Sequence, residues 1–184
     1  MTGTEDREIA EVTRFWRDAG PDAWFAKNAA FDDRFRTTLG LLHWRAARRE
    51  LDRWNASPDG ALALMILLDQ FPRNCFRDTA HSYATDGLAR HYAMRAVEEG
   101  LDLQLVPKLR AFIYLPFEHS EDPQDQERSV AMFDVLGDKE YLQYAELHRD
   151  IIRRFGRFPH RNAVLGRMPT PEELDYLAEG GFAG

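Results

Sequence analysis

The chain has 184 residues, 44% of them hydrophobic, which is enough to bury the core of one domain of ordinary size. Its formal net charge of −7 argues against general nucleic-acid binding, and its single cysteine, Cys75, excludes an internal disulfide and a cysteine-based zinc site. The longest wholly apolar stretch, residues 61–68, is too short to cross a bilayer, which takes about 20 residues, and no signal-peptide pattern opens the chain. We therefore expect a cytoplasmic protein that binds neither membrane nor nucleic acid.

Helical signals run through the first half of the chain. Thr2 and Glu5 have the spacing of a capping box, so a helix is expected to begin there. Ser57 followed by Pro58 is typical of an N-cap and first turn, and Pro72 is expected to end that helix because proline lacks an N–H. Two further helices are expected before Ser57, over residues 28–40 and 41–54.

The second half carries signals of the same kind. Asp78 is expected to cap a helix that Gly100 closes, and the next helix is expected to stop at Pro116. Two longer helices should follow over about 123–136 and 139–155, and Thr170 with Glu173 forms a capping box before the last helix. Eight or nine helices with short connections predict one all-α domain of antiparallel pairs over residues 1–184.

Polar side chains concentrate in three short segments at expected helix ends. They are Asp69-Gln70-Phe-Pro-Arg73-Asn74, His119-Ser-Glu121 and Arg154-Phe-Gly-Arg157-Phe-Pro-His160-Arg161-Asn162. From residue 149 to residue 167, six arginines stand against a single acid, Asp150. An acidic protein with a local arginine cluster is better suited to a discrete anion than to a long polyanion. We therefore expect the three segments to share one site.

The arginines of these segments have the chemistry to hold an anion. Guanidinium groups form bidentate hydrogen bonds to carboxylate or phosphate, and asparagine amides add fixed donors and acceptors. The competing interpretation is structural: these arginines bind carbonyls at helix ends or pair with internal acids such as Asp69, Glu121 and Glu127. The expected ligand-binding residues are Asp69, Gln70, Arg73, Asn74, Arg157, Arg161 and Asn162.

Two histidines of these segments are candidates for general acid–base chemistry. His119 precedes Glu121 by two residues, and a carboxylate can orient an imidazole and tune its pKa toward neutrality. His160 stands among arginines, which would lower its pKa and favour the neutral, base-competent form. The expected catalytic residues are therefore His119, Glu121 and His160, while His148, in the middle of a helix, is a weaker candidate.

Other chemistries have little support in the sequence. The paired Glu-x-x-His motifs of di-iron proteins are absent, Asp78-x-x-His81 stands alone, and no His-Glu-x-x-His occurs. Ser120 is outside any Gly-x-Ser-x-Gly turn, and a lone cysteine beside an aromatic residue, as Cys75 is, usually serves as a small buried side chain. No metal and no cofactor is expected.

Several stretches taken together resemble a known family. They are residues 67–74, 114–116, 119–121, 126–130, 155–162 and 165–167, and they are similar to the bacterial domain of unknown function DUF924 over nearly the whole chain. The resemblance implies an all-helical fold of the tetratricopeptide-like kind without its regular repeat, and it brings no established activity. Phe117-Glu118 and the acidic run 121–125 depart slightly from the family pattern.

Two functions remain open from the sequence. The first is a site for a small anionic metabolite, with acid–base chemistry as its potential activity. The second is a peptide- or protein-interaction module, since helical stacks of the tetratricopeptide type grip peptides in a groove and the polar segments would then serve the fold. Tryptophans could line such a groove, although at helical spacing they are more often core: Trp16, Trp24, Trp44 and Trp54.

Overall fold

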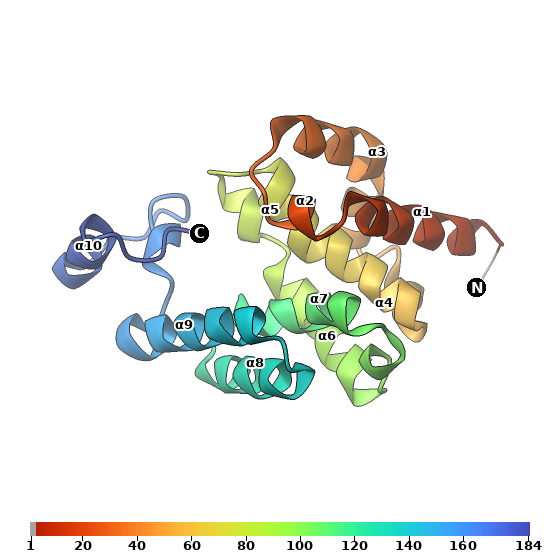
Figure 1. Ribbon diagram of the computed structural model, residues 1–184. Coiled ribbons are helices and arrows are strands. Elements are labelled where there is room, and N and C mark those ends of the chain that lie inside the picture. The colour runs from red at the N-terminus through yellow and green to blue at the C-terminus, as the bar shows by residue number, and fades with distance from the viewer. Residues whose placement is uncertain (1–2) are drawn as a thin grey trace. The chain divides into compact units, whose positions relative to one another are not determined.

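All regular structure in the described part of the chain is helical (Figure 1). The computed structural model describes residues 3–184, and no strand occurs in that range. The capping role expected for Thr2 lies outside the described residues. The all-α prediction is confirmed, and a tetratricopeptide-like stack stays a prediction. The α-helices are α1 (Gly3–Ala19), α2 (Pro21–Trp24), α3 (Ala29–Ala47), α4 (Pro58–Met65), α5 (Phe71–Cys75), α6 (Asp86–Glu98), α7 (Pro107–Glu118), α8 (Pro123–Leu136), α9 (Lys139–Phe155) and α10 (Pro171–Ala178).

The described chain divides into two compact units. The first comprises the chain up to Arg77 together with His81–Pro116, and the second comprises Asp78–Ala80 and Phe117–Gly184. One domain over the whole chain stays a prediction from the sequence.

The core of the first unit is built around α4 and the turn that follows it. Residues 61–68 are all fully buried, which explains why this stretch is apolar on every side. Helices α1 and α6 pack against α4, and Phe35 lies 5.5 Å from Trp16 and 5.0 Å from Phe71 between ring centroids. In the described range, no helix combines the length and the apolar character that crossing a bilayer requires.

Pro72 does not end its helix, which corrects the expectation from the sequence. A π-helical turn, Ile66–Gln70, comes between α4 and α5, and Pro72 lies inside α5. The backbone N–H of Phe71 donates to the carbonyl of Ile66, five residues back, so the chain absorbs one extra residue ahead of the proline. The wider turn relieves the steric clash that the proline ring would cause with a carbonyl of a regular helix.

Side chains bond three carbonyls of this turn. His43 Nδ1 lies 2.8 Å from the carbonyl oxygen of Leu67, Thr85 donates its hydroxyl to that of Leu68 at 2.5 Å, and Arg73 donates to that of Asp69 at 3.0 Å. Buried carbonyls need such partners, since an orphaned one costs about as much as a lost hydrogen bond. The polar residues near Pro72 therefore have a structural task in the first unit.

Three other expected boundaries are wrong, because packing overrides local propensity. Helix α3 continues through Gly40, where the sequence predicted a break, and α7 continues past Pro116 to Glu118. Asp78 has a left-handed backbone with φ of 59° and caps no long helix; α6 begins instead at Asp86. The caps expected at Asn28 and Ser57 are confirmed, since each side chain accepts a backbone N–H three residues on.

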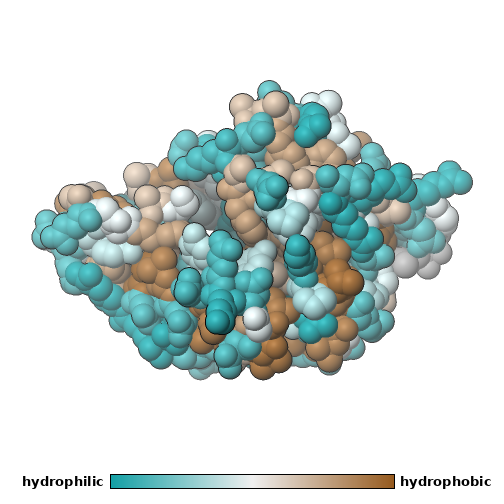
Figure 2. Space-filling model, in the orientation of Figure 1, coloured by the Kyte–Doolittle hydropathy of each residue, from teal (hydrophilic) through white to brown (hydrophobic). Residues whose placement is uncertain are grey.

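The second unit contains the hairpin of α8 and α9, which lie side by side (Figure 1). Gly137, with φ of 79°, closes α8, and the carboxylate of Asp138 caps α9 directly afterwards, so the two helices are antiparallel. The inner face of α9 carries Ile151 and Ile152, which pack with Phe158. Figure 2 shows a mixed surface on the left of the view, with hydrophilic residues along its lower edge and hydrophobic ones among and above them.

Candidate functional site

Glu121 ties the second polar segment to the third inside the second unit. Its Oε1 accepts the backbone N–H of Phe158 at 2.8 Å, and Arg167 donates to Oε2 at 2.8 Å and to Oε1 at 3.1 Å. Burial alone would raise the pKa of Glu121, but the hydrogen bonds from Arg167 and Phe158 lower it. Glu121 therefore fastens residue 158 to the stretch that follows α7, which agrees with the structural alternative that the sequence left open, and its role beside His119 stays a prediction.

Glu173 fixes the other side of the third segment. Arg157 donates to both of its oxygens, at 2.6 and 2.8 Å, while the amide of Asn162 and the backbone N–H of Thr170 donate to Oε2 at 3.1 and 2.7 Å. The hydrogen bond from Arg157 is the main reason that the pKa of Glu173 is lowered to about 2. The capping box expected at Thr170 and Glu173 is confirmed, and it also anchors two of the expected ligand-binding residues, Arg157 and Asn162.

Three histidines gather in the same unit, and with Phe158 and Phe182 they form what we call the histidine cluster. The ring of His148 lies 6.5 Å from that of His119, 5.3 Å from Phe158 and 4.6 Å from Phe182, measured between ring centroids. His160 lies 5.3 Å from Phe182 and 5.7 Å from Phe158. The two catalytic candidates, His119 and His160, thus flank a third imidazole that the sequence ranked below them.

His148 is held as a neutral imidazole at the centre of this cluster. It is 5% exposed, and its Nδ1–H donates to the carbonyl of Tyr144 at 2.8 Å, which leaves Nε2 without a proton. Burial lowers the pKa of His148 to about 3, although the Tyr144 hydrogen bond opposes this, and the neighbouring His119, Arg161 and His160 lower it further. A carboxylate oxygen of Glu118 lies 3.6 Å from Nδ1, beyond hydrogen-bond distance, and does not reverse this effect.

Arg161 is the arginine that lies at the histidine cluster. Its Nη1 donates to the backbone carbonyl of His119 at 3.0 Å, and its guanidinium carbon lies 4.3 Å from the centroid of the Phe158 ring. Arg161 is only 6% exposed. The ring face and the carbonyl fix the orientation of this guanidinium group. A fixed guanidinium is suited to recognise carboxylate or phosphate.

The first polar segment belongs to the first unit and forms a network of its own there. Arg73 donates to both oxygens of Asp86, at 2.8 and 3.0 Å, and its Nη1 lies 3.1 Å from Asp69. Burial would lower the pKa of Arg73, but the charges of Asp69 and Asp86 raise it well above its usual value. The amide of Gln70 donates to Asp69 at 2.6 Å, and that of Asn74 donates to Asp32 at 2.9 Å. These side chains connect α5 with α3 and α6.

Two other kinds of site, a reactive cysteine and a metal centre, can be compared with the described structure. Burial raises the pKa of the Cys75 thiol to about 12, so it is not ionised near neutral pH. Within residues 3–184, no three His, Cys, Asp or Glu side chains are arranged to hold a metal ion.

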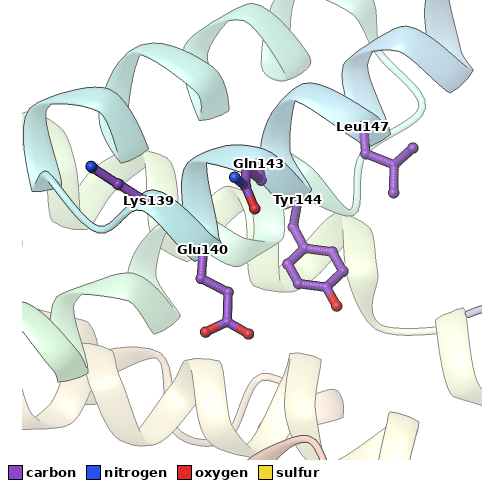
Figure 3. A pocket seen from close by; sticks show the side chains of 5 residues that line it. All are labelled: Lys139, Glu140, Gln143, Tyr144 and Leu147. Carbon is purple, nitrogen blue, oxygen red and sulfur yellow. The ribbon is translucent and has the colours of Figure 1, made fainter.

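A shallow depression lies along one side of α9, and its lining residues belong to none of the three polar segments. Figure 3 shows its lining, in which Glu140, Tyr144 and Leu147 extend from the same side of the helix. Tyr144 is 48% exposed and Leu147 is 40% exposed, and Lys139 and Gln143 complete the lining. None of these five residues was expected to bind a ligand, and the depression lacks arginine and histidine.

Sequence reasoning undervalued several residues of the second unit. His148 continues the inward stripe of Ala145, Ile151 and Ile152 along α9, and this spacing could have placed it in the core. Arg167 stood in a family stretch without an assigned partner. Phe182 had no signal at all, because it follows the last helix in a segment rich in glycine.

Comparison with known proteins places the chain among bacterial relatives. The family described as "Bacterial protein of unknown function (DUF924)" matches residues 12–181. A solved structure of a protein of unknown function from Agrobacterium tumefaciens, ATU0120, has a TM-score of 0.93 and 53% sequence identity to this chain. That match covers 95% of this chain and 99% of the other. No match to a curated protein was found.

Proposed function

The chain belongs to the DUF924 family, and we propose that its second unit binds a small carboxylate or phosphate at the histidine cluster, with Arg161 as the cationic anchor. The observation that carries this proposal is the gathering of one buried guanidinium and two histidines, His119 and His160, around a neutral His148. His119 and His160, expected from the sequence, belong to this cluster, and Arg161, also expected, contacts His119 and Phe158 in the same unit. Arg157 and Asn162 hold that segment in place through Glu173.

The pKa values divide the work among the histidines. With a pKa lowered to about 3, His148 is too weak a base to take a proton efficiently near neutral pH, so it serves as a fixed polar wall. His119 and His160 are partly exposed and are the groups proposed to exchange a proton with the ligand. Each can also become a second positive charge beside the anion when protonated.

Anion binding can be tested directly on Arg161. Isothermal titration with acetate and with inorganic phosphate should show binding to the wild type, and Arg161→Gln should weaken it at least tenfold, or about 1.4 kcal/mol. Arg154→Gln is the matched control, because Arg154 is an arginine of the same segment whose exposed side chain pairs with Glu172. The control should change the affinity less than twofold. Absence of binding to the wild type, or equal losses in the two variants, would reject the proposal.

The histidines make a second, independent contribution. Acetate affinity is expected to rise as the pH falls from 7.5 to 5.5, because acetate stays ionised while an imidazole at the site gains a proton. His119→Asn and His160→Asn should flatten this rise, whereas His91→Asn, a change in the first unit, should leave it as in the wild type. If acetate affinity rises with falling pH in both His119→Asn and His160→Asn as steeply as in the wild type, an acid–base role for these histidines is excluded.

The alternative of a peptide-binding module has less support. Trp16, Trp24 and Trp54, which were candidates to line a groove, are buried in the first unit, and only Trp44 of the four tryptophans is substantially exposed, at 44%. A buried tryptophan contributes to the core rather than to a partner surface.

A further inference from the structure

Phe182 sits between two members of the histidine cluster. Its ring centroid lies 4.6 Å from that of His148 and 5.3 Å from that of His160, with interplanar angles of 65° and 79°. Edge-to-face arrangements of this kind are favourable for aromatic rings. The place occupied by Phe182 is therefore an aromatic site bounded by imidazoles, next to the segment that carries Arg161.

The segment that carries Phe182 is attached by its backbone to the end of α10. It follows the end of α10 at Ala178, contains no helix, and begins with Gly180, whose backbone has φ of +87°. Three consecutive N–H groups bond it to the end of α10: that of Gly180 donates to the carbonyl of Leu177 at 3.3 Å, that of Gly181 to the carbonyl of Tyr176 at 2.9 Å, and that of Phe182 to the hydroxyl of Tyr176 at 2.9 Å. A helix-free segment with glycine in its backbone opens at a smaller free-energy cost than a helix does.

Further contacts place this segment over the cluster rather than beside it. A Cβ added to Gly184 would lie 3.3 Å from Cδ2 of His160, so the backbone there runs directly against the imidazole. Phe182 also packs on the small core formed by Ile151, Ile152 and Phe158. The segment from Gly180 to Gly184 thus covers His148 and His160 together.

We propose that Phe182 occupies the position of the ligand's own apolar group, so that the natural ligand is a carboxylate bearing an aromatic ring, which displaces Phe182 when it binds. This inference rests on the proposed anion site and names its ligand class. The ring of the ligand takes the place between His148 and His160, and its carboxylate is directed to Arg161. Exchange of one ring for another conserves the buried apolar area, so the carboxylate contact determines whether displacement is favourable.

The test compares two probes on the full chain with and without Phe182. Calorimetric titration of Phe182→Ala should give at least tenfold tighter binding of 3-phenylpropionate than the wild type, because the competing ring is gone and the open state no longer has to be populated first. Acetate, which lacks a ring, should change less than threefold. Val135→Ala, which alters a side chain that is 84% exposed in the same unit, is the control and should leave both affinities unchanged.

Each result decides a different question. If acetate binds in a manner that depends on Arg161 but Phe182→Ala changes both probes equally, the aromatic ligand class is wrong while the anion site stands. If neither probe binds the wild type or the variant, the anion site is wrong as well. Phe182→Leu keeps an apolar side chain and removes the ring, so it replaces the alanine variant if circular dichroism shows that the latter does not fold. It should bind 3-phenylpropionate at least threefold more tightly than the wild type. No gain in affinity would refute the inference.

Discussion

The buried imidazole of His148 makes a quantitative prediction about pH and stability. In the unfolded chain this side chain has a pKa near 6.5, whereas in the folded protein its pKa is lowered to about 3. Between these values the unfolded state binds a proton that the folded state does not, so the free energy of unfolding falls as the pH falls. From pH 6.5 to pH 5.0 the loss attributable to His148 is about 2 kcal/mol, at about 1.4 kcal/mol per pH unit.

The measurement is urea unfolding followed by circular dichroism at pH 7.5 and pH 5.0. His148→Gln and His148→Phe cannot titrate, so each should lose about 2 kcal/mol less than the wild type between the two pH values. The comparison uses the change with pH, in which the constant cost of replacing a buried ring cancels. His43 and His81, whose pKa values are also lowered by burial, titrate alike in all three proteins and cancel too.

One outcome would refute this reasoning. Glu118 lies 3.6 Å from Nδ1 of His148 and could in principle hold the ring as an imidazolium. The folded pKa would then be raised, and His148 would add stability on acidification that the variants lack. A wild type that gains stability relative to both variants at pH 5.0 would show that ion pairing outweighs desolvation at this position.

Two further substitutions test the supports of the fold. Glu173→Gln should destabilise the protein by about 2 kcal/mol in urea unfolding, because several hydrogen bonds to a buried carboxylate weaken. Glu172→Gln, at the neighbouring exposed position, should cost less than about 0.5 kcal/mol. Equal losses in the two variants would contradict this prediction. Gly60→Ala would place Cβ 2.0 Å from the Trp54 carbonyl oxygen and should lower the free energy of unfolding by about 3 kcal/mol. Gly87→Ala is the control: its Cβ meets open space, so this variant should be neutral or stabilising. A Gly60→Ala variant as stable as the wild type would contradict the packing argument.

The sequence predicted the features that depend on local chemistry. Side-chain caps at Asn28 and Ser57 and the capping box at Thr170 require only residues a few positions apart, and all three occur. The glycine ends of α8 and α9 follow for the same reason, since Gly137 and Gly156 both adopt the left-handed conformation that a helix C-terminus uses.

The features that sequence reasoning missed depend on contacts between distant residues. Pro72 was expected to stop a helix, but the carbonyls of the π turn find partners in His43 and Thr85, 24 and 17 residues away from their acceptors. No local pattern announces such partners. Gly40 is passed by α3 without a break for a similar reason, because tertiary packing outweighs a propensity cost of about 1 kcal/mol.

The candidate site shows the same division. The sequence singled out the third segment for its arginines and histidine, and its His160 belongs to the histidine cluster with His119 while its Arg161 donates to the carbonyl of His119. Which arginine pairs with which acid was not predictable, since Glu121 meets Arg167 across 46 residues and Glu173 meets Arg157 across 16. The ligand-binding roles themselves stay predictions.

The π turn at Ile66–Gln70 makes the length of this stretch as important as its composition. A regular α-helix advances about 100° per residue, so removing any one of these five residues would turn everything after it by roughly that angle. Arg73 and Asn74 would then swing away from Asp86 and Asp32. We therefore expect deletion of a single residue from this turn to be more damaging than exchange of one of its apolar side chains for another of similar size.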